Sequence, residues 1–162
     1  MSGRLMVEDP AQCADNRPSF YADPVAWLVA RAVEQTLTEP VERDQVAVLV
    51  MSATTTRPTM AGIADKAARG RVSPLRFAGA NPGILAGLTC IQQGFTGPSL
   101  VLANEPADAL DTAAAVVDSW LDSGQARHVV CVAHRADPNG HQARAVVVGG
   151  HDDRADRLAQ LL

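Results

Sequence analysis

The stretch from Ser99 to Gly124 places the tightest limits on how this 162-residue chain can fold. Residues 99–103 form a short apolar run that predicts a buried strand, and a polar turn at residues 104–106 interrupts it. A strongly patterned helix follows, with a proline at its first position. A strand, a sharp turn and a helix in this order can hold a side chain beside a helix N-terminus, where catalytic residues are often presented.

Four further segments predict strands, at residues 3–7, 45–53, 128–133 and 143–148. The run at 45–53 is continuously apolar, which is typical of a strand buried on both faces of a sheet. Helical patterns separate most of these strands, so the order is β-α-β-α-β-α-β-β. The sequence therefore predicts an α/β fold with one mixed sheet of about five strands and helices on both faces. We expect a single domain over residues 1–162, with a loop at 8–23 and a C-terminal tail at 152–162.

Charge and composition exclude several classes of function. The net charge of −4 and a pI near 5.5 argue against a nucleic-acid-binding protein, which normally carries a clustered basic surface. The three cysteines follow no metal-binding spacing, so we expect reduced thiols and neither a metal nor a cofactor. The sequence shows neither a signal peptide nor an apolar run of membrane-spanning length. A cytoplasmic protein without membrane contact is expected.

Three motifs in the middle of the chain appear in a fixed order. They are R-V-S-P-L-R-F at 71–77, N-P-G-I-L-A-G at 81–87 and G-F-T-G-P-S-L at 94–100. This series resembles the N-terminal half of β-ketoacyl synthases of the thiolase fold, which show S-P, N-x-x-A-G and G-x-x-G-P-S patterns ahead of their nucleophile. The resemblance covers most of the chain from about residue 23 to residue 149. It implies a single thiolase-like half.

The same resemblance implies that the nucleophile is missing. In the family a catalytic cysteine lies in a T-A-C-x-x-G turn after the G-P-S motif, and residue-by-residue matching puts Pro106 at its position, within the turn Asn104, Glu105, Pro106. The second half, which supplies two catalytic histidines in the family, has no counterpart here. We therefore expect no catalytic residue of the ketosynthase type, and a pseudoenzyme rather than an enzyme.

The other cysteines, Glu105 and the histidines are poor candidates for replacing the missing nucleophile. Cys90 and Cys131 lie in apolar segments, which favours inert buried thiols, and Cys13 lies in a loop without a nearby histidine. Glu105 is the ionisable group of the turn, and a carboxylate there is ordinarily a helix cap. The histidines match no catalytic pattern and are expected to be ordinary surface or core residues. They are His128, His134, His141 and His151.

The helix after the turn carries an acidic stripe. Helical geometry brings four aspartates to one side, opposite an apolar side: Asp108, Asp111, Asp118 and Asp122. In the family the corresponding helix is enclosed between the two halves, where four carboxylates would carry a large desolvation cost. The stripe therefore predicts a helix with one face in water or against a basic partner.

Three hypotheses about function follow. The first, implied by the resemblance, is a non-catalytic protein of the chain-length-factor type. It would associate with an active ketosynthase, an acyl carrier protein or both, in polyketide or fatty-acid-type biosynthesis. In such dimers the strand before the turn pairs antiparallel with its mate, so a homodimer or heterodimer interface is expected at Ser99, Leu100, Val101, Leu102, Ala103 and Asn104. The second is an acyl-thioester-processing enzyme that uses Glu105 as a base. The third is a stand-alone module that binds an acyl chain or another small molecule.

Overall fold

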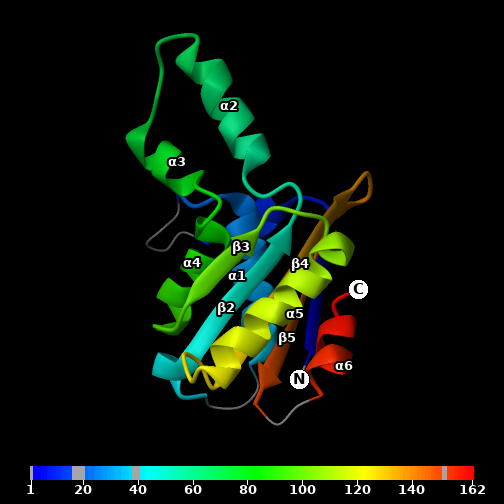
Figure 1. Cartoon of the computed structure of the whole chain (residues 1–162). Helices are drawn as coiled ribbons and strands as arrows, with labels where there is room; N and C mark the ends of the chain where they lie inside the picture. Colours follow the sequence, from blue (N-terminus) through cyan, green and yellow to red (C-terminus); the bar gives the residue numbers. More distant parts are fainter. Residues whose placement is uncertain (1, 16–20, 38–40, 151–152) are drawn as a thin grey trace.

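The computed structural model describes residues 2–15, 21–37, 41–150 and 153–162. In these parts of the chain, five strands form one mixed sheet in the order β1-β5-β4-β2-β3 (Figure 1). The strands are β1 (Ser2–Val7), β2 (Val46–Ser52), β3 (Ser99–Leu102), β4 (His128–Asp137) and β5 (Gly140–Gly149). β2 runs parallel to both β3 and β4, whereas β5 is antiparallel to β4 and β1 is antiparallel to β5. The predicted mixed α/β sheet is confirmed.

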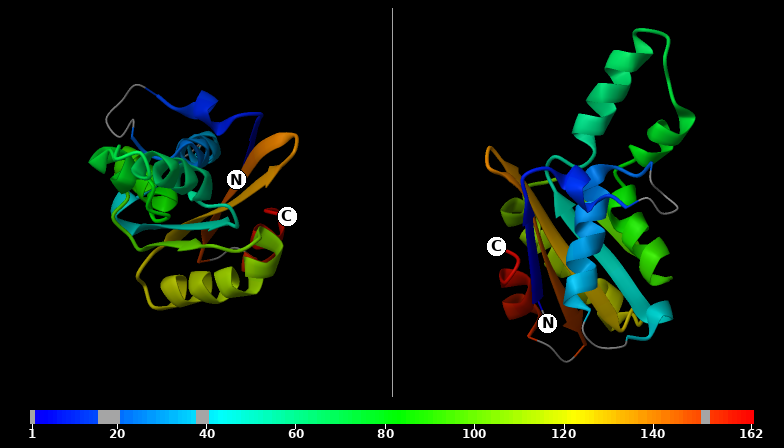
Figure 2. Two further views of the ribbon diagram at one scale, coloured as in Figure 1. Left: turned by 90° about the horizontal axis from the view of Figure 1, so that it is seen from above. Right: turned by 180° about the vertical axis from the view of Figure 1, so that it is seen from behind.

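Helices cover both faces of the sheet. α1 (Pro24–Thr36) and α4 (Ile84–Gln93) lie on one face, and α5 (Pro106–Asp122) and α6 (Arg154–Ala159) lie on the other (Figure 2). All seven residues of β2 are buried, because this strand has a neighbour on each side and helices above and below. Val48 faces the side of α1 and α4, and Leu49 faces the side of α5. The continuous apolar run at 45–53 therefore correctly predicts a doubly covered strand.

The first helix begins where the sequence predicts. Asp23 is the N-cap of α1 and accepts a hydrogen bond from the backbone N–H of Val25 at 2.8 Å, while Pro24 occupies the first helical position. The expectation of a loop throughout residues 8–23 is wrong at Pro10–Cys13, which form a short 3-10 helix (η1). The side chain of Asp9 caps this turn, and Pro10 and Cys13 are buried. A second 3-10 turn, η2 (Arg43–Gln45), precedes β2.

β3 is an edge strand and not the buried strand that its apolar sequence predicts. Its only strand neighbour in the described chain is β2, and Ser99 and Leu100 are exposed. Gly97 fixes where the strand begins, because a Cβ at this position would collide with the backbone of Val46. The apolar side chains of Val101 and Leu102 pack on the cores of the two sheet faces, whereas no strand of the described residues lies along the outer edge of β3.

A helical hairpin extends beyond the end of the sheet (Figures 1 and 2). It consists of α2 (Arg57–Ala67), a connection and α3 (Pro74–Gly79), and we refer to residues 57–79 as the hairpin. Hydrogen bonds hold its base to the body: the hydroxyl of Thr56 donates to the carbonyl of Ala80 at 2.6 Å, and the N–H of Asp23 donates to the carbonyl of Gly79 at 3.1 Å. The hairpin therefore has two anchored ends and a projecting tip.

Candidate functional site

The turn after β3 has the expected strand-turn-helix form. β3 ends at Leu102, and α5 begins at Pro106, which is buried at the first helical position. Glu105 is the N-cap residue, yet its side chain forms no capping hydrogen bond; its backbone carbonyl accepts from the N–H groups of Asp108 and Ala109, both at 3.0 Å. Asn104 and Glu105 are exposed. The expectation that the Glu105 carboxylate caps the helix is therefore wrong, because backbone geometry and Pro106 alone start α5.

The turn itself offers little for covalent catalysis. Proline has neither a nucleophilic side chain nor an N–H group that could stabilise an oxyanion. Burial lowers the reactivity of the three cysteine thiols outside the turn. It raises the pKa of Cys13 and Cys90, and it raises the pKa of Cys131 to about 12. A cysteine with a raised pKa is a poor nucleophile near neutral pH. The described residues also contain no group of three or more histidine, cysteine or acidic side chains placed to hold a metal ion.

Two of the four histidines are brought together at one end of the sheet. His134 is only 1% exposed, and its Nε2 lies 3.0 Å from Nδ1 of His141. His128 lies at the opposite end of β4, and His151 falls outside the described residues. Sequence reasoning treats each histidine separately and misses this contact. The D-P-N-G turn was a usable signal, because its hairpin register places His134 and His141 diagonally on one face.

The free edge of β3 presents backbone groups for another strand. The N–H of Val48 donates to the carbonyl of Pro98 at 3.0 Å, which sets the register of the parallel pair. The alternation of a parallel ladder then points the N–H and C=O groups of Leu100 and Leu102 toward β2, and those of Ser99 and Val101 away from the sheet. Leu100 is 36% exposed, and Ile91 on the neighbouring α4 is 67% exposed. This edge can therefore accept a further strand, which would also cover the exposed side chain of Leu100 on the α5 side.

The acidic stripe lies on the exposed side of α5. Asp108, Asp111, Asp118 and Asp122 are all exposed, while Ala109, Ala113 and Val117 are buried against the sheet. Part of the stripe already has a basic partner within the chain. Arg154 at the start of α6 donates to Asp118 at 2.7 Å and to Asp122 at 2.8 Å, and this bond lowers the pKa of Asp122. Asp108 and Asp111 lie nearer the turn, and the ion pairs of Arg154 do not include them.

The hairpin combines exposed apolar side chains with positive charge. Four large apolar residues on it are more than 40% exposed: Met60, Val72, Leu75 and Phe77. The hairpin also carries five basic residues and one acidic residue, a net charge of +4 in a chain of net charge −4. An apolar hollow of about 510 Å³ lies at its base, lined in part by Thr55, Met60 and Phe77. A volume of this size is in the range of small-molecule sites.

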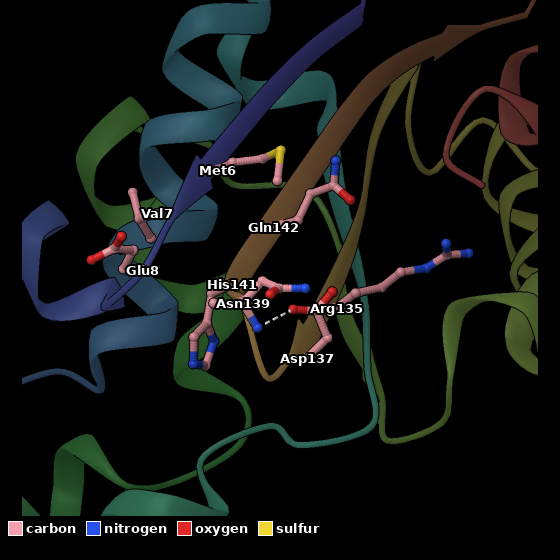
Figure 3. Close-up of a pocket in the computed structure, with 9 residues that line it drawn as sticks. Met6, Val7, Glu8, Arg135, Asp137, Asn139, His141 and Gln142 are labelled. Carbon is pink, nitrogen blue, oxygen red and sulfur yellow. Dashed lines mark hydrogen bonds between the residues drawn. The ribbon is translucent and has the colours of Figure 1, made fainter.

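A second hollow lies beside the turn that joins β4 to β5. It has a volume of about 310 Å³ and is lined by residues of β1, β4 and β5 and by the segment after β1, among them Glu8, Arg135, Asp137 and His141 (Figure 3). The N–H of Asn139 donates to the carboxylate of Asp137 at 2.7 Å and shapes the turn. The lining is more polar than that of the hollow at the hairpin base.

Comparison with known proteins finds a similar architecture in ketosynthases of known structure. No protein-family model and no curated protein matches the chain. Solved structures do. The ishigamide ketosynthase/chain length factor superposes with a TM-score of 0.67 at 15% identity, over 89% of this chain and 49% of that chain. A ketosynthase in complex with its chain length factor, from Xenorhabdus doucetiae, gives a TM-score of 0.66 at 14% identity over 86% and 64% of the two chains.

This chain has a thiolase-like ketosynthase fold. A third structure, a type II polyketide synthase acyl-carrier protein in complex with its ketosynthase bound to the hexaketide, matches with a TM-score of 0.63 at 14% identity over 90% of this chain and 51% of that chain. The chain thus spans between about half and two thirds of the length of these ketosynthase structures. The fold implied by the three sequence motifs is confirmed. No helix in the described residues is long and apolar enough to cross a membrane.

Proposed function

We propose that the chain is a non-catalytic ketosynthase-like protein that associates with an active ketosynthase, with or without an acyl carrier protein, in polyketide or fatty-acid-type biosynthesis. The observation that carries the proposal is the free edge of β3, which leads directly into a turn with Pro106 in place of a nucleophile. Two of the structural neighbours contain a chain length factor, and one contains an acyl-carrier protein. A single-domain chain in the cytoplasm is part of this proposal.

The proposed contact is the edge formed by residues 99–104. An antiparallel strand of the partner would bond to the outward N–H and C=O groups of Ser99 and Val101. Leu100, which lies opposite Leu49 on the α5 side of the sheet, would be covered by the same contact, and this removes exposed apolar surface from water. Asp108 and Asp111 lie on the exposed side of the helix that follows, so the partner is expected to present basic side chains near the beginning of α5.

The test replaces Val101 with proline. Val101→Pro removes one outward N–H group and leaves the N–H groups of Leu100 and Leu102 available to β2, so the sheet is retained while strand addition is blocked. The matched control is Val101→Thr, which keeps the N–H group and the β-branched side chain. Each variant is mixed with a ketosynthase and an acyl carrier protein from the same genome, and complex formation is followed by light scattering after gel filtration.

The wild-type chain and Val101→Thr are expected to form the complex and to alter the length of the product made by the synthase. Val101→Pro is expected to bind at least about tenfold more weakly, because it loses the outward N–H group that would bond to the partner strand. A tenfold loss of affinity corresponds to about 1.4 kcal/mol. A wild-type chain that neither binds the synthase nor changes its product would remove the proposal. Equal binding by the proline and threonine variants would place the contact elsewhere.

A second candidate function rests on the hollow at the hairpin base. Its volume of about 510 Å³ and its apolar lining suit an acyl chain or another small apolar ligand, which is the function of a stand-alone binding module. A fluorescent fatty acid is expected to bind the isolated chain, and Phe77→Ser is expected to weaken that binding. Ile91→Ser, a substitution of another exposed apolar residue outside the hollow, serves as the control.

A further inference from the structure

Three side chains from three strands form a buried chain of hydrogen bonds, which we call the relay. Ser52 lies at the end of β2, directly opposite His134 on β4, and its Oγ is 2.8 Å from Nδ1 of His134. Nε2 of His134 is 3.0 Å from Nδ1 of His141 on β5, and the two imidazole rings stack with centroids 5.3 Å apart. Ser52 and His134 are 0% and 1% exposed, so water cannot readily replace these bonds.

The bond between Ser52 and the backbone determines the direction of the relay. The Oγ of Ser52 accepts a hydrogen bond from the N–H of Thr55 at 3.0 Å, and its own proton needs an acceptor. Among the described residues that acceptor is Nδ1 of His134. His134 must then carry its proton on Nε2 and donate it to Nδ1 of His141. In the reverse direction the buried hydroxyl of Ser52 would accept two bonds and donate none.

His141 is the point where this chain meets solvent and charge. It is half-buried and lines the hollow of Figure 3. The charged and titratable groups around it come from every neighbouring element: Asp23 at the start of α1, Glu8 after β1, and His134, Arg135 and Asp137 on β4. Three of them are carboxyl groups, so His141 is the member of the relay that lies among acidic side chains.

We propose that proton uptake by His141 reverses the relay and transmits the change to Ser52. A protonated imidazole donates from both nitrogens, so Nδ1 of His141 can no longer accept. Nε2 of His134 must become the acceptor, and the proton of His134 must move to Nδ1, where it is donated to Ser52. The hydroxyl proton of Ser52 then loses its acceptor. One protonation event at the surface thus changes the bonding of a residue about two strands away.

The buried end of the relay controls the base of the hairpin. Ser52 holds the N–H of Thr55, a residue with φ of +46°, which is rare for a β-branched side chain. Thr56, the next residue, bonds Ala80 and so joins both ends of the hairpin. Asp23 binds the hairpin from the other side through Gly79 and Thr59. Once its proton has no acceptor, the hydroxyl of Ser52 is expected to turn toward another partner, to weaken its bond to the Thr55 N–H and so to loosen the loop from which the hairpin projects.

The position of the proton on His134 tests the proposal directly. In a series from pH 7.5 to pH 5, long-range ¹H–¹⁵N NMR of the isolated chain is expected to show the Nε2–H tautomer of His134 while His141 is neutral. The Nδ1–H tautomer is expected wherever the same spectra show His141 protonated. Burial lowers the pKa of His134 to about 4, so this ring remains neutral at pH 5 and its tautomer can be assigned. A single tautomer at both pH values, with His141 protonated at the lower one, overturns the proposal without any variant.

Hydrogen exchange of the Thr55 amide tests the link to the hairpin. After correction for the intrinsic pH dependence of exchange, its protection is expected to fall about tenfold between pH 7.5 and pH 5 in the wild type. His141→Asn retains an acceptor for His134 but cannot be protonated, so its Thr55 protection is expected to be independent of pH. His128→Asn, which alters a histidine at the far end of β4, should behave as the wild type does. A fall in protection that persists in His141→Asn would contradict the relay.

Discussion

At the scale of single residues, His134 makes folding stability depend on pH. Burial, with a smaller contribution from His141, lowers the pKa of His134 from 6.5 to about 4. The unfolded chain therefore binds a proton between these values that the folded chain does not, and stability falls as pH decreases from about 6.5 to about 4. The shift corresponds to roughly 3 kcal/mol at 1.36 kcal/mol per unit. Urea denaturation at a series of pH values measures this loss.

The variant His134→Gln isolates this contribution. It is expected to be less stable at pH 7.5, because the bonds to Ser52 and His141 are altered, but to lose less stability than the wild type on acidification to pH 4.5. His128→Gln keeps His134 and should retain the full loss. Equal losses in the wild type and His134→Gln would show that other groups cause the pH dependence.

The relay also shows what a single sequence can and cannot reveal about residues. The turn at Asp137–Gly140 predicts the register of β4 and β5, and hence that His134 and His141 share a face. The partner Ser52 is not predictable in this way, because the pairing of β2 with β4 connects residues 82 positions apart. Glu105 illustrates another limit: its position as N-cap is clear from the sequence, whereas the direction of its side chain depends on surroundings that no local pattern describes.

At the scale of elements, the sequence predicts where strands occur better than how they are covered. The strands at 45–53 and 99–103 are both apolar, yet β2 lies between two strands and β3 is at the edge. Their length differs, at seven and four residues, but burial follows from strand order, which depends on long-range pairing. The short helix η1 in the segment expected to be a loop has a clear local reason in Asp9 and Pro10, although four residues are too few to show periodicity.

The attachment of α6 leads to a prediction about packing and charge. Leu158 and Leu161 are 2% and 1% exposed in the core on the α5 side, whereas Arg154 binds two exposed aspartates. Leu158→Ala is expected to lower the free energy of unfolding by about 2–4 kcal/mol, the usual cost of truncating a buried leucine. Arg154→Gln should change it little, because exposed ion pairs contribute little.

Urea denaturation of the two variants at pH 7.5 measures both effects. Repeating the Arg154→Gln measurement at high salt provides a control, since the wild type and this variant should then converge. A loss for Arg154→Gln as large as that for Leu158→Ala would mean that the ion pairs, and not the buried leucines, hold α6 on α5.

At the scale of the whole molecule, the free edge of β3 predicts concentration-dependent association of the isolated chain. Without a ketosynthase, two copies can pair their β3 strands antiparallel across a two-fold axis, as an isologous dimer. Sedimentation is expected to show a monomer–dimer equilibrium, and Val101→Pro is expected to shift it toward the monomer. Val101→Thr should leave it unchanged. A dimer that Val101→Pro does not weaken would place the self-contact at another surface.

Charge is distributed unevenly along the molecule, so that its two ends differ in the sign of their charge. The hairpin carries +4 and the remainder −8, with the hairpin projecting from one end of the sheet. A separation of this kind acts as an electric dipole that is felt over about 10 Å at 0.1 M salt. An approaching partner with its own charged patches is turned before contact, so encounters occur in few orientations at low ionic strength and in many at high ionic strength. The projecting hairpin would then influence how fast a complex forms, whichever surface finally holds it together.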